Sequence, residues 1–317
     1  MRSNNVLGFI FAATLDDKIP ELASSRTTAS VPIGGKYRII DFDLSNMSNS
    51  GISNVGIVAK SNFQSLMDHV GSGSAYDLSK RRSNLSILPP YDGKAFSSFV
   101  ETIYNMHGYI EHCREEYVLI SQGNVITNID YTDVFDFHSK KKADITLIYK
   151  NHAIPQGYDR PITLDVDNDG KVNQIFVKPG VVDKGVFNHA YGSILIKKDL
   201  LMSEIRNAIS VNQLDVRRLI QSSLGKYSIY AYENKGYCAA ISSINDYFEF
   251  NMDLMKKEVR DELFNPQRPI YTKVRDDAPS RYGLTSNVKN SIIAQGCVIN
   301  GEVENLSLIH ISEPTRP

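Results

Sequence analysis

The stretch VPIGGKYRIIDFDLSNMSNSG, residues 31–51, carries the densest pattern of the chain. It opens with two adjacent glycines, Gly34 and Gly35, which permit positive φ or a close approach of the backbone. Two cations that could donate hydrogen bonds to an anion follow at Lys36 and Arg38. Two polar side chains that can cap a helix or bond backbone groups come next, Ser45 and Asn46. The stretch therefore predicts either an anion-contacting loop or a glycine turn that leads into a strand and a helix.

Outside this stretch, short apolar runs alternate with helical spacing of apolar residues over residues 6–241. Strands that alternate with helices predict an α/β fold of three layers around a mostly parallel sheet. Asn168-Asp169-Gly170 predicts a hairpin turn rather than a calcium-binding loop. Four helical sets, which we interpret as core, lie within residues 63–70, 103–113, 216–224 and 248–259. The candidate strands are residues 6–11, 55–58, 117–120, 145–149, 194–196 and 227–231.

The pattern changes after residue 264. Three prolines among polar and charged residues predict a linker over residues 265–283. Beyond it, Ile293 and Ile299 lie six residues apart with glycines nearby, and a six-residue period suggests the coils of a β-helix. The expected boundaries are therefore 1–264 for the α/β domain, 265–283 for the linker and 284–305 for a short β-helix.

The final segment, residues 306–317, begins with LSLIHISEPTR. This string resembles the in-frame translation of a transposase adapter used in DNA library preparation. We interpret the segment as a sequencing-adapter artefact, so that the gene would continue differently and the β-helix would be truncated. The alternative is a natural polar tail with a helix-stopping proline at Pro314.

Composition limits the classes of function. The chain has 317 residues, of which 42% are apolar and 22% charged, as in globular proteins. The formal net charge is −1, which gives no support for a nucleic-acid or anionic-membrane partner. The three cysteines are far apart, so neither a disulfide framework nor a zinc cluster is indicated, and we expect a cytoplasmic protein. The apolar run of residues 6–13 is too short to span a bilayer and is interpreted as a buried strand rather than a signal peptide.

Three stretches together resemble the glucose-1-phosphate adenylyltransferases, or ADP-glucose pyrophosphorylases. They are residues 31–51, residues 236–255 with the run INDYFEFNMDLM, and residues 286–305. The resemblance implies a three-layer nucleotidyltransferase domain of the GT-A, Rossmann-like type, followed by the start of a left-handed β-helix. It also implies the family reaction, in which ATP and glucose 1-phosphate give ADP-glucose and pyrophosphate. Such phosphoryl chemistry requires positioned cations, here Mg²⁺, more than covalent catalysis.

The phosphate-binding motifs of the family are not matched. The family's glycine-rich loop corresponds, without gaps, to residues 12–19, where all the motif glycines are absent. Asp16 and Asp17 place negative charge where a triphosphate would lie, which repels it. Lys18 stands at the position of the family's arginine, and the R-A-K-P motif reads Arg-Thr-Thr-Ala at residues 26–29.

The metal ligands implied by the resemblance are also absent. The family's G-D-H run supplies a Mg²⁺-binding aspartate, and Asn124 stands at that position. The second aspartate, in a W-R-D-V-G-T run, corresponds to Ala240. A neutral amide is a poor substitute for a carboxylate on Mg²⁺, and a methyl group cannot bind the ion. From the family's sugar-phosphate motif E-K-P, the lysine remains as Lys178.

A kept scaffold with lost metal ligands resembles the GlgD-type, non-catalytic subunit of the family. It predicts a regulatory subunit of bacterial glycogen biosynthesis that has no cofactor of its own and joins a catalytic chain that holds Mg²⁺. One alternative is an active nucleotidyltransferase with shifted ligands such as Asp130 or Asp133. Another is a subunit that senses a sugar-phosphate effector through Lys178, with Lys36 and Arg38 as further anion contacts.

Overall fold

Strand β1 (Val6–Phe11) is an interior strand of the main sheet, and all six of its residues are buried. The computed structural model describes residues 3–12, 19–60, 62–79, 83–89, 98–153, 161–177, 185–274 and 276–308. A continuous apolar run suits a strand that is covered on both faces. Strand β1 runs parallel to its two neighbours, β4 (Asn54–Val58) and β6 (Tyr117–Gln122), and β4 is parallel to β5 (Asn84–Leu88).

The other half of the sheet is built on a long antiparallel strand, β11 (Val186–Lys197), which pairs with β6. Across the described residues the sheet has nine strands, of which β10 and β11 run against the other seven. The prediction of a mostly parallel sheet is therefore confirmed. The remaining strands of this half are β8 (Ile145–Ala153), β9 (Ile162–Val166), β10 (Val172–Val177) and β12 (Ile229–Glu233).

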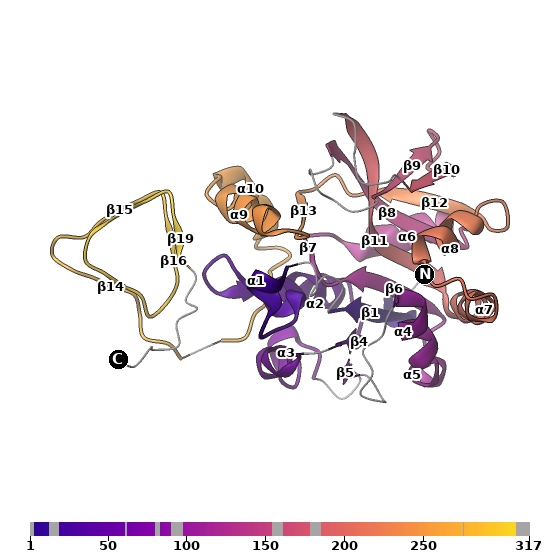
Figure 1. Cartoon of the computed structure of the whole chain (residues 1–317), viewed down its shortest axis with the longest axis horizontal. Helices are drawn as coiled ribbons and strands as arrows, with labels where there is room; N and C mark the ends of the chain where they lie inside the picture. Colours follow the sequence, from indigo (N-terminus) through magenta and orange to yellow (C-terminus); the bar gives the residue numbers. More distant parts are fainter. Residues whose placement is uncertain are drawn as a thin grey trace.

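Helices cover both faces of the sheet, which confirms the three layers (Figure 1). The longest helix of the described residues has 13 residues, and no described helix is long and apolar enough to cross a bilayer. One face carries α4 (Phe99–Asn105), α5 (His107–His112), α7 (Lys198–Ser210) and α8 (Val216–Ser222). The other carries α2 (Ile39–Asn49), α3 (Gln64–Val70) and α6 (Tyr131–Lys141).

A third apolar cluster joins small elements near the carboxyl ends of the central strands. Its main buried side chains are contributed by the glycine-rich segment, by α2 and by a helix pair late in the chain. The elements involved are α1 (Pro20–Ala23), the hairpin β2 (Pro32–Ile33) and β3 (Tyr37–Arg38), the pair β7 (Val125–Thr127) and β13 (Cys238–Ala240), and helices α9 (Ile244–Asp253) and α10 (Lys257–Leu263).

Two helical predictions differ from the structure. The apolar set of residues 103–113 is divided between α4 and α5, which meet at Met106. The core interpretation of Phe248 is wrong, because its side chain is 61% exposed. Phe250 and Leu254, which lie four residues apart, face the core instead. The predicted set spans two helices, α9 and α10, and Val259 on α10 packs against the core as predicted.

The predicted hairpin turn between β9 and β10 is confirmed. The Asp167 carboxylate accepts hydrogen bonds of 2.9 Å from the backbone N–H groups of Asp169 and Lys171. Gly170 has a φ of +84°, which a side chain would strain. The acidic residues of this segment therefore shape a turn between two antiparallel strands.

Three parallel strand pairs make up the end of the described chain, and they are consistent with the start of a β-helix. This yellow coil lies to one side of the sheet domain in Figure 1. The first strand lies within the predicted linker, and residues 309–317 lie outside the described residues. The left-handed sense of the coil and the adapter origin of 306–317 stay predictions. The pairs are β14 (Arg281–Tyr282) with β17 (Val298–Ile299), β15 (Asn287–Lys289) with β18 (Glu302–Glu304), and β16 (Ile292–Ile293) with β19 (Ser307–Leu308).

Gly34 and Gly35 form the turn between β2 and β3, with φ of +55° and +82°. A side chain on Gly35 would meet Ile292 at 3.3 Å, so the glycine allows the coil to approach this turn. Of the two interpretations of residues 31–51, the structure shows the glycine turn that leads into a strand and a helix.

Helix α2, which lies within residues 31–51, is largely buried. Its polar side chains bond backbone groups that are distant in the sequence. Asn46 donates to the carbonyl oxygen of Thr127 at 2.8 Å and accepts from the N–H of Ile129 at 3.2 Å. Ser45 accepts from the N–H of Tyr271 at 2.8 Å, and Asn49 donates to the carbonyl of Pro269 at 3.0 Å. The predicted bonding of backbone groups by Ser45 and Asn46 is thus confirmed, whereas neither residue caps a described helix.

Replacing Asn46 with alanine should lower the free energy of unfolding by about 2–4 kcal/mol, because two buried backbone groups lose their partner. Urea unfolding measures the change. Asn245→Ala is the matched control, since that amide bonds only the exposed Glu249 side chain. A loss for Asn46→Ala no larger than that of the control would contradict the structural role of α2.

Candidate functional site

The candidate site lies at the carboxyl ends of β1 and β6, where open α/β sheets bind their ligands. The N–H of Gly123, just after β6, donates to the carbonyl of Phe11 at 2.9 Å. The N–H of Ala29 donates to the carbonyl of Ala12 at 3.1 Å. A side chain on Gly123 would lie 2.9 Å from the Phe11 carbonyl oxygen, so only glycine fits between these segments.

Asn124 and Ala240, which the resemblance aligns with two aspartates, lie side by side. The Asn124 carbonyl accepts from the N–H of Ile241 at 2.9 Å, and the Asn124 side chain donates through Nδ2 to the Ile241 carbonyl at 3.2 Å. Ala240 is paired with Val125 in the β13–β7 ladder. The fold therefore brings together two positions that are 116 residues apart in the sequence.

The side chains present at these two positions do not fit Mg²⁺. Asn124 is 1% exposed, and its Oδ1 atom has no hydrogen-bond partner within the described structure. The methyl group of Ala240 belongs to a small buried apolar cluster with Val125 and Tyr191. In the part of the chain that the structure describes, no group of three or more His, Cys, Asp or Glu side chains is placed to hold a metal. Mg²⁺ prefers carboxylate oxygens, and the pair offers one neutral amide oxygen.

Asp130, named as a shifted metal ligand, has a structural role at the other end of β7. Its carboxylate accepts from the N–H of Thr132 at 2.8 Å, which caps α6, and it forms an ion pair with Arg268. Burial raises the pKa of Asp130, but the Thr132 hydrogen bonds and the Arg268 charge hold it below its ordinary value. Asp133 lies one turn further along α6.

Another buried carboxyl group is that of Asp43, on α2, which packs against β6. Its Oδ1 atom accepts from the Ser121 hydroxyl at 2.5 Å. Burial raises the pKa of Asp43 to about 7, although the Ser121 hydrogen bond lowers it. Protonation of this carboxyl competes with the binding of a divalent cation, because the ion binds the ionised form.

The two candidate anion contacts of the glycine-rich segment lie in different environments. Arg38 is buried, and its guanidinium donates to both the carbonyl and the hydroxyl oxygen of Ser65 at 2.7 Å. Lys36 is exposed, with its ammonium group 4.8 Å from the centre of the Tyr37 ring. A role of either residue in binding an effector stays a prediction. Lys178 and residues 13–18, which include Asp16 and Asp17, lie outside the described residues.

Three aromatic side chains that the sequence did not predict lie beside the site: Tyr191, His152 and His189. The Tyr191 hydroxyl lies 2.5 Å from Nε2 of His152, and that nitrogen lies 3.3 Å from Nδ1 of His189. Burial and the nearby Lys150 lower the pKa of His152 to about 4, while burial and His152 lower the pKa of His189 to about 3. Both imidazoles are therefore neutral at pH 7. No local motif marks these residues, because β8 and β11 bring them together only in the folded sheet.

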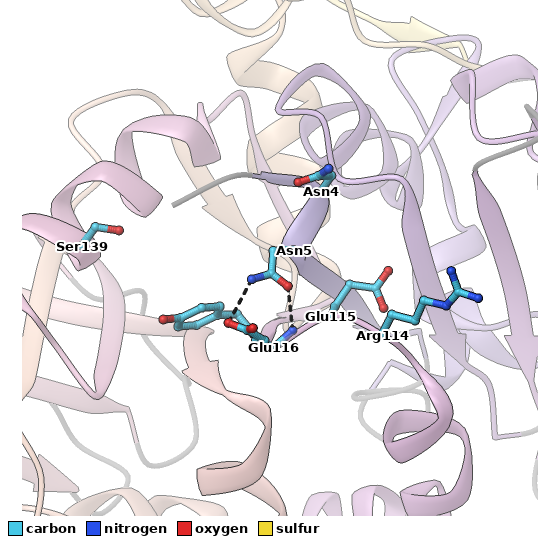
Figure 2. A pocket seen from close by; sticks show the side chains of 7 residues that line it. Asn4, Asn5, Arg114, Glu115, Glu116 and Ser139 are labelled. Carbon is cyan, nitrogen blue, oxygen red and sulfur yellow. Dashed lines mark hydrogen bonds between the residues drawn. The ribbon is translucent and has the colours of Figure 1, made fainter.

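Two surface pockets lie elsewhere, and neither is lined by Asn124 or Ala240. One, of about 540 Å³, lies at the amino ends of β1 and β6, where Figure 2 shows Asn5 bonded to Glu116. The other, of about 670 Å³, lies between α6, the 167–170 turn and β12. The first pocket lies at the edge opposite the carboxyl edge where such sheets bind their ligands, whereas the second is lined by residues at the carboxyl ends of β9 and β12.

Replacing Asn124 with aspartate should destabilise the fold at pH 7 by about 1–3 kcal/mol, because the donor to Ile241 is lost and a charge is buried without a donor. Thermal unfolding with and without Mg²⁺ measures the effect. Asn245→Asp, on the exposed side of α9, is the control. Mg²⁺-dependent stabilisation of the wild-type chain would contradict the misfit of the metal.

The buried histidines should make stability depend on pH. Their pKa values are about 4 and 3 in the folded chain and 6.5 ordinarily, so the unfolded chain binds more protons below pH 6.5. The contribution of these two histidines to stability is complete above pH 6.5 and falls as the pH drops from 6.5 towards 4. His189→Asn should give a shallower fall in urea midpoints than the wild type, and His112→Asn, which changes an exposed histidine, is the control. An unchanged slope in His189→Asn would refute this account.

Known proteins resemble this chain along most of its length. A family model described as nucleotidyl transferase covers residues 17–257. The glycogen biosynthesis protein GlgD of Bacillus subtilis is 30% identical over the whole chain and 83% of its own length, and that of Geobacillus stearothermophilus is 37% identical over 96% and 79%. Glucose-1-phosphate adenylyltransferase of Clostridium acetobutylicum is 30% identical over 96% of this chain and 82% of its own. The chain therefore belongs to the nucleotidyl transferase family, in the group that contains GlgD and glucose-1-phosphate adenylyltransferase.

Proposed function

We propose that this chain is a regulatory subunit of a bacterial glucose-1-phosphate adenylyltransferase and does not catalyse the reaction itself. In this proposal a catalytic chain of the same family holds Mg²⁺ and converts ATP and glucose 1-phosphate into ADP-glucose and pyrophosphate. The names of the relatives support the proposal, because some are named for glycogen biosynthesis and others for the adenylyl transfer.

The observation that carries the proposal is the pair Asn124 and Ala240. The fold keeps both positions together, yet neither side chain carries the carboxylate that the resemblance expects. Nucleotidyl transfer depends on cations that neutralise the phosphates, so a chain without these ligands lacks a principal source of catalysis. The loss of both ligands within an intact scaffold favours a regulatory role, exerted through contacts with a partner, over a catalytic role.

The alternative of an active enzyme with shifted ligands has less support. Asp130 caps α6 and pairs with Arg268, so its carboxylate is already used in holding the fold. Asp43 is buried beneath β6 with its hydroxyl partner Ser121. Neither carboxylate belongs to a group of three or more His, Cys, Asp or Glu side chains that could hold a metal, within the residues that the structure describes.

A regulatory subunit acts by changing the free energy of its partner's active state through their interface. The same interface could carry the response to a sugar-phosphate effector, for which Lys178 is the proposed anchor. By reciprocity, an effector that tightens the assembly must bind the assembly more tightly than the separate chains.

The test is ADP-glucose formation from ATP, glucose 1-phosphate and Mg²⁺, measured for this chain alone, for the catalytic subunit of the same genome alone, and for their mixture. We expect the chain alone to be at least about 100-fold slower than the partner. We expect the mixture to differ from the partner alone by about fivefold or more in kcat, KM or effector response.

One double variant serves as a control in this assay. Asp130→Asn, combined with Asp133→Asn, should leave the turnover of the mixture unchanged if shifted ligands play no part. Turnover by the isolated chain that disappears in this double variant would overturn the proposal and establish the shifted-ligand enzyme instead.

A further inference from the structure

We infer that the Tyr191 side chain fills the space beside position 240, where the resemblance places a metal-binding carboxylate. The site therefore lacks the two carboxylates and is also filled by packed side chains. This inference rests on the proposed function, because it explains how a non-catalytic site is stabilised in its present form. It concerns the chain's own residues Tyr191, Ala240 and Val125, and it can be tested without substrate, metal or partner.

The backbone of β11 aims Tyr191 at the site. The pairing of β11 with β8 shifts register between Ala190 and Ile194, which is the mark of a bulge or local irregularity. Gly192, inside this shift, has a φ of +86°, and a side chain on it would collide with the side chain of Gln122 at the end of β6. Bulges redirect side chains, and Tyr191 lies within this shift.

The ring of Tyr191 lies in the apolar cluster that contains the Ala240 methyl group. Tyr191 and Val125 are each 5% exposed, and Ala240 is 7% exposed. Val125 and Ala240 are direct partners in the β7–β13 ladder, so their side chains lie on the same face of that pair. A carboxylate at position 240 would enter this cluster without water, and a charge buried among apolar groups is strongly unfavourable.

Both the hydroxyl and the ring of Tyr191 contact neighbouring histidines. It lies 2.5 Å from Nε2 of His152, and the Tyr191 and His152 rings stack with centroids 5.3 Å apart. His189 is fully buried and lies with its ring centre 4.6 Å from that of Tyr191. Moving Tyr191 away from Ala240 would break the hydroxyl contact and both ring contacts, so the closed arrangement is the stable one.

A double-mutant cycle tests the closure. The variants are Ala240→Asp, Tyr191→Ser and the two combined, and the readout is the urea midpoint at pH 7.5. If Tyr191 closes the position, Ala240→Asp should lower the midpoint in the wild-type background and have less than half of that effect beside Tyr191→Ser, because water then reaches the carboxylate. Equal shifts in the two backgrounds would overturn the inference.

Ala239→Asp is the matched control. It is the neighbouring residue on β13, it pairs with Ile126, and it packs against a different cluster. Its shift should be the same with and without Tyr191→Ser, and a rescue equal to that of Ala240→Asp would show that Tyr191→Ser acts non-specifically. Tyr191→Phe keeps the ring and removes the hydroxyl, and it should preserve most of the Ala240→Asp effect.

A milder pair keeps the test decisive if Ala240→Asp does not fold. Ala240→Ser adds one hydroxyl to the same cluster, and its smaller shift should again be relieved by Tyr191→Ser. Additive shifts in this pair would overturn the inference. Failure of the proposed function would appear as turnover by the isolated wild-type chain and would leave this cycle unchanged, so the two results are distinguishable.

Discussion

The hydrogen bonds made by the polar side chains of helix α2 are the constraint on which the rest of the structure depends. Nine residues of α2 are buried, yet Ser45 and Asn46 are among them. Each bonds a backbone group in a segment that is 80 or more residues away in the sequence. A buried amide or hydroxyl without a partner destabilises a fold, so these side chains permit one placement of β7, the start of α6 and the segment around Tyr271.

The geometry of the candidate site depends on this placement of β7. The Asn46 amide holds the end of β7 through Thr127, and β7 pairs with β13, so backbone contacts place Asn124 and Ala240 next to each other. The backbone arrangement does not require carboxylates at either position. A scaffold of this kind can persist while the chemistry at its site changes, because function depends on the side chains placed on a fold.

The replacements at the site have a common physical consequence. Two carboxylates held close together repel each other and stay hydrated unless a metal ion neutralises them. An amide at Asn124 and a methyl group at Ala240 remove that repulsion, and Tyr191 and Val125 cover the methyl group. The result is an apolar, well-packed region that suits a subunit whose contribution is its shape. The unpartnered Oδ1 atom of Asn124 is the one polar atom of this pair left without compensation in the described structure.

Sequence alone determined the features that local chemistry controls. The continuous apolar run predicted β1, and Asn168-Asp169-Gly170 predicted the hairpin turn between β9 and β10. The alternation of strands and helices predicted the three layers. Positions 124 and 240 were found by resemblance to the family, since neither spacing nor composition marks them. The tertiary structure decided that Phe248 is exposed, that Arg38 bonds Ser65 and that Tyr191 lies beside Ala240. These outcomes depend on strand register and on which helix face meets the core, and both are set by contacts between residues far apart in the chain.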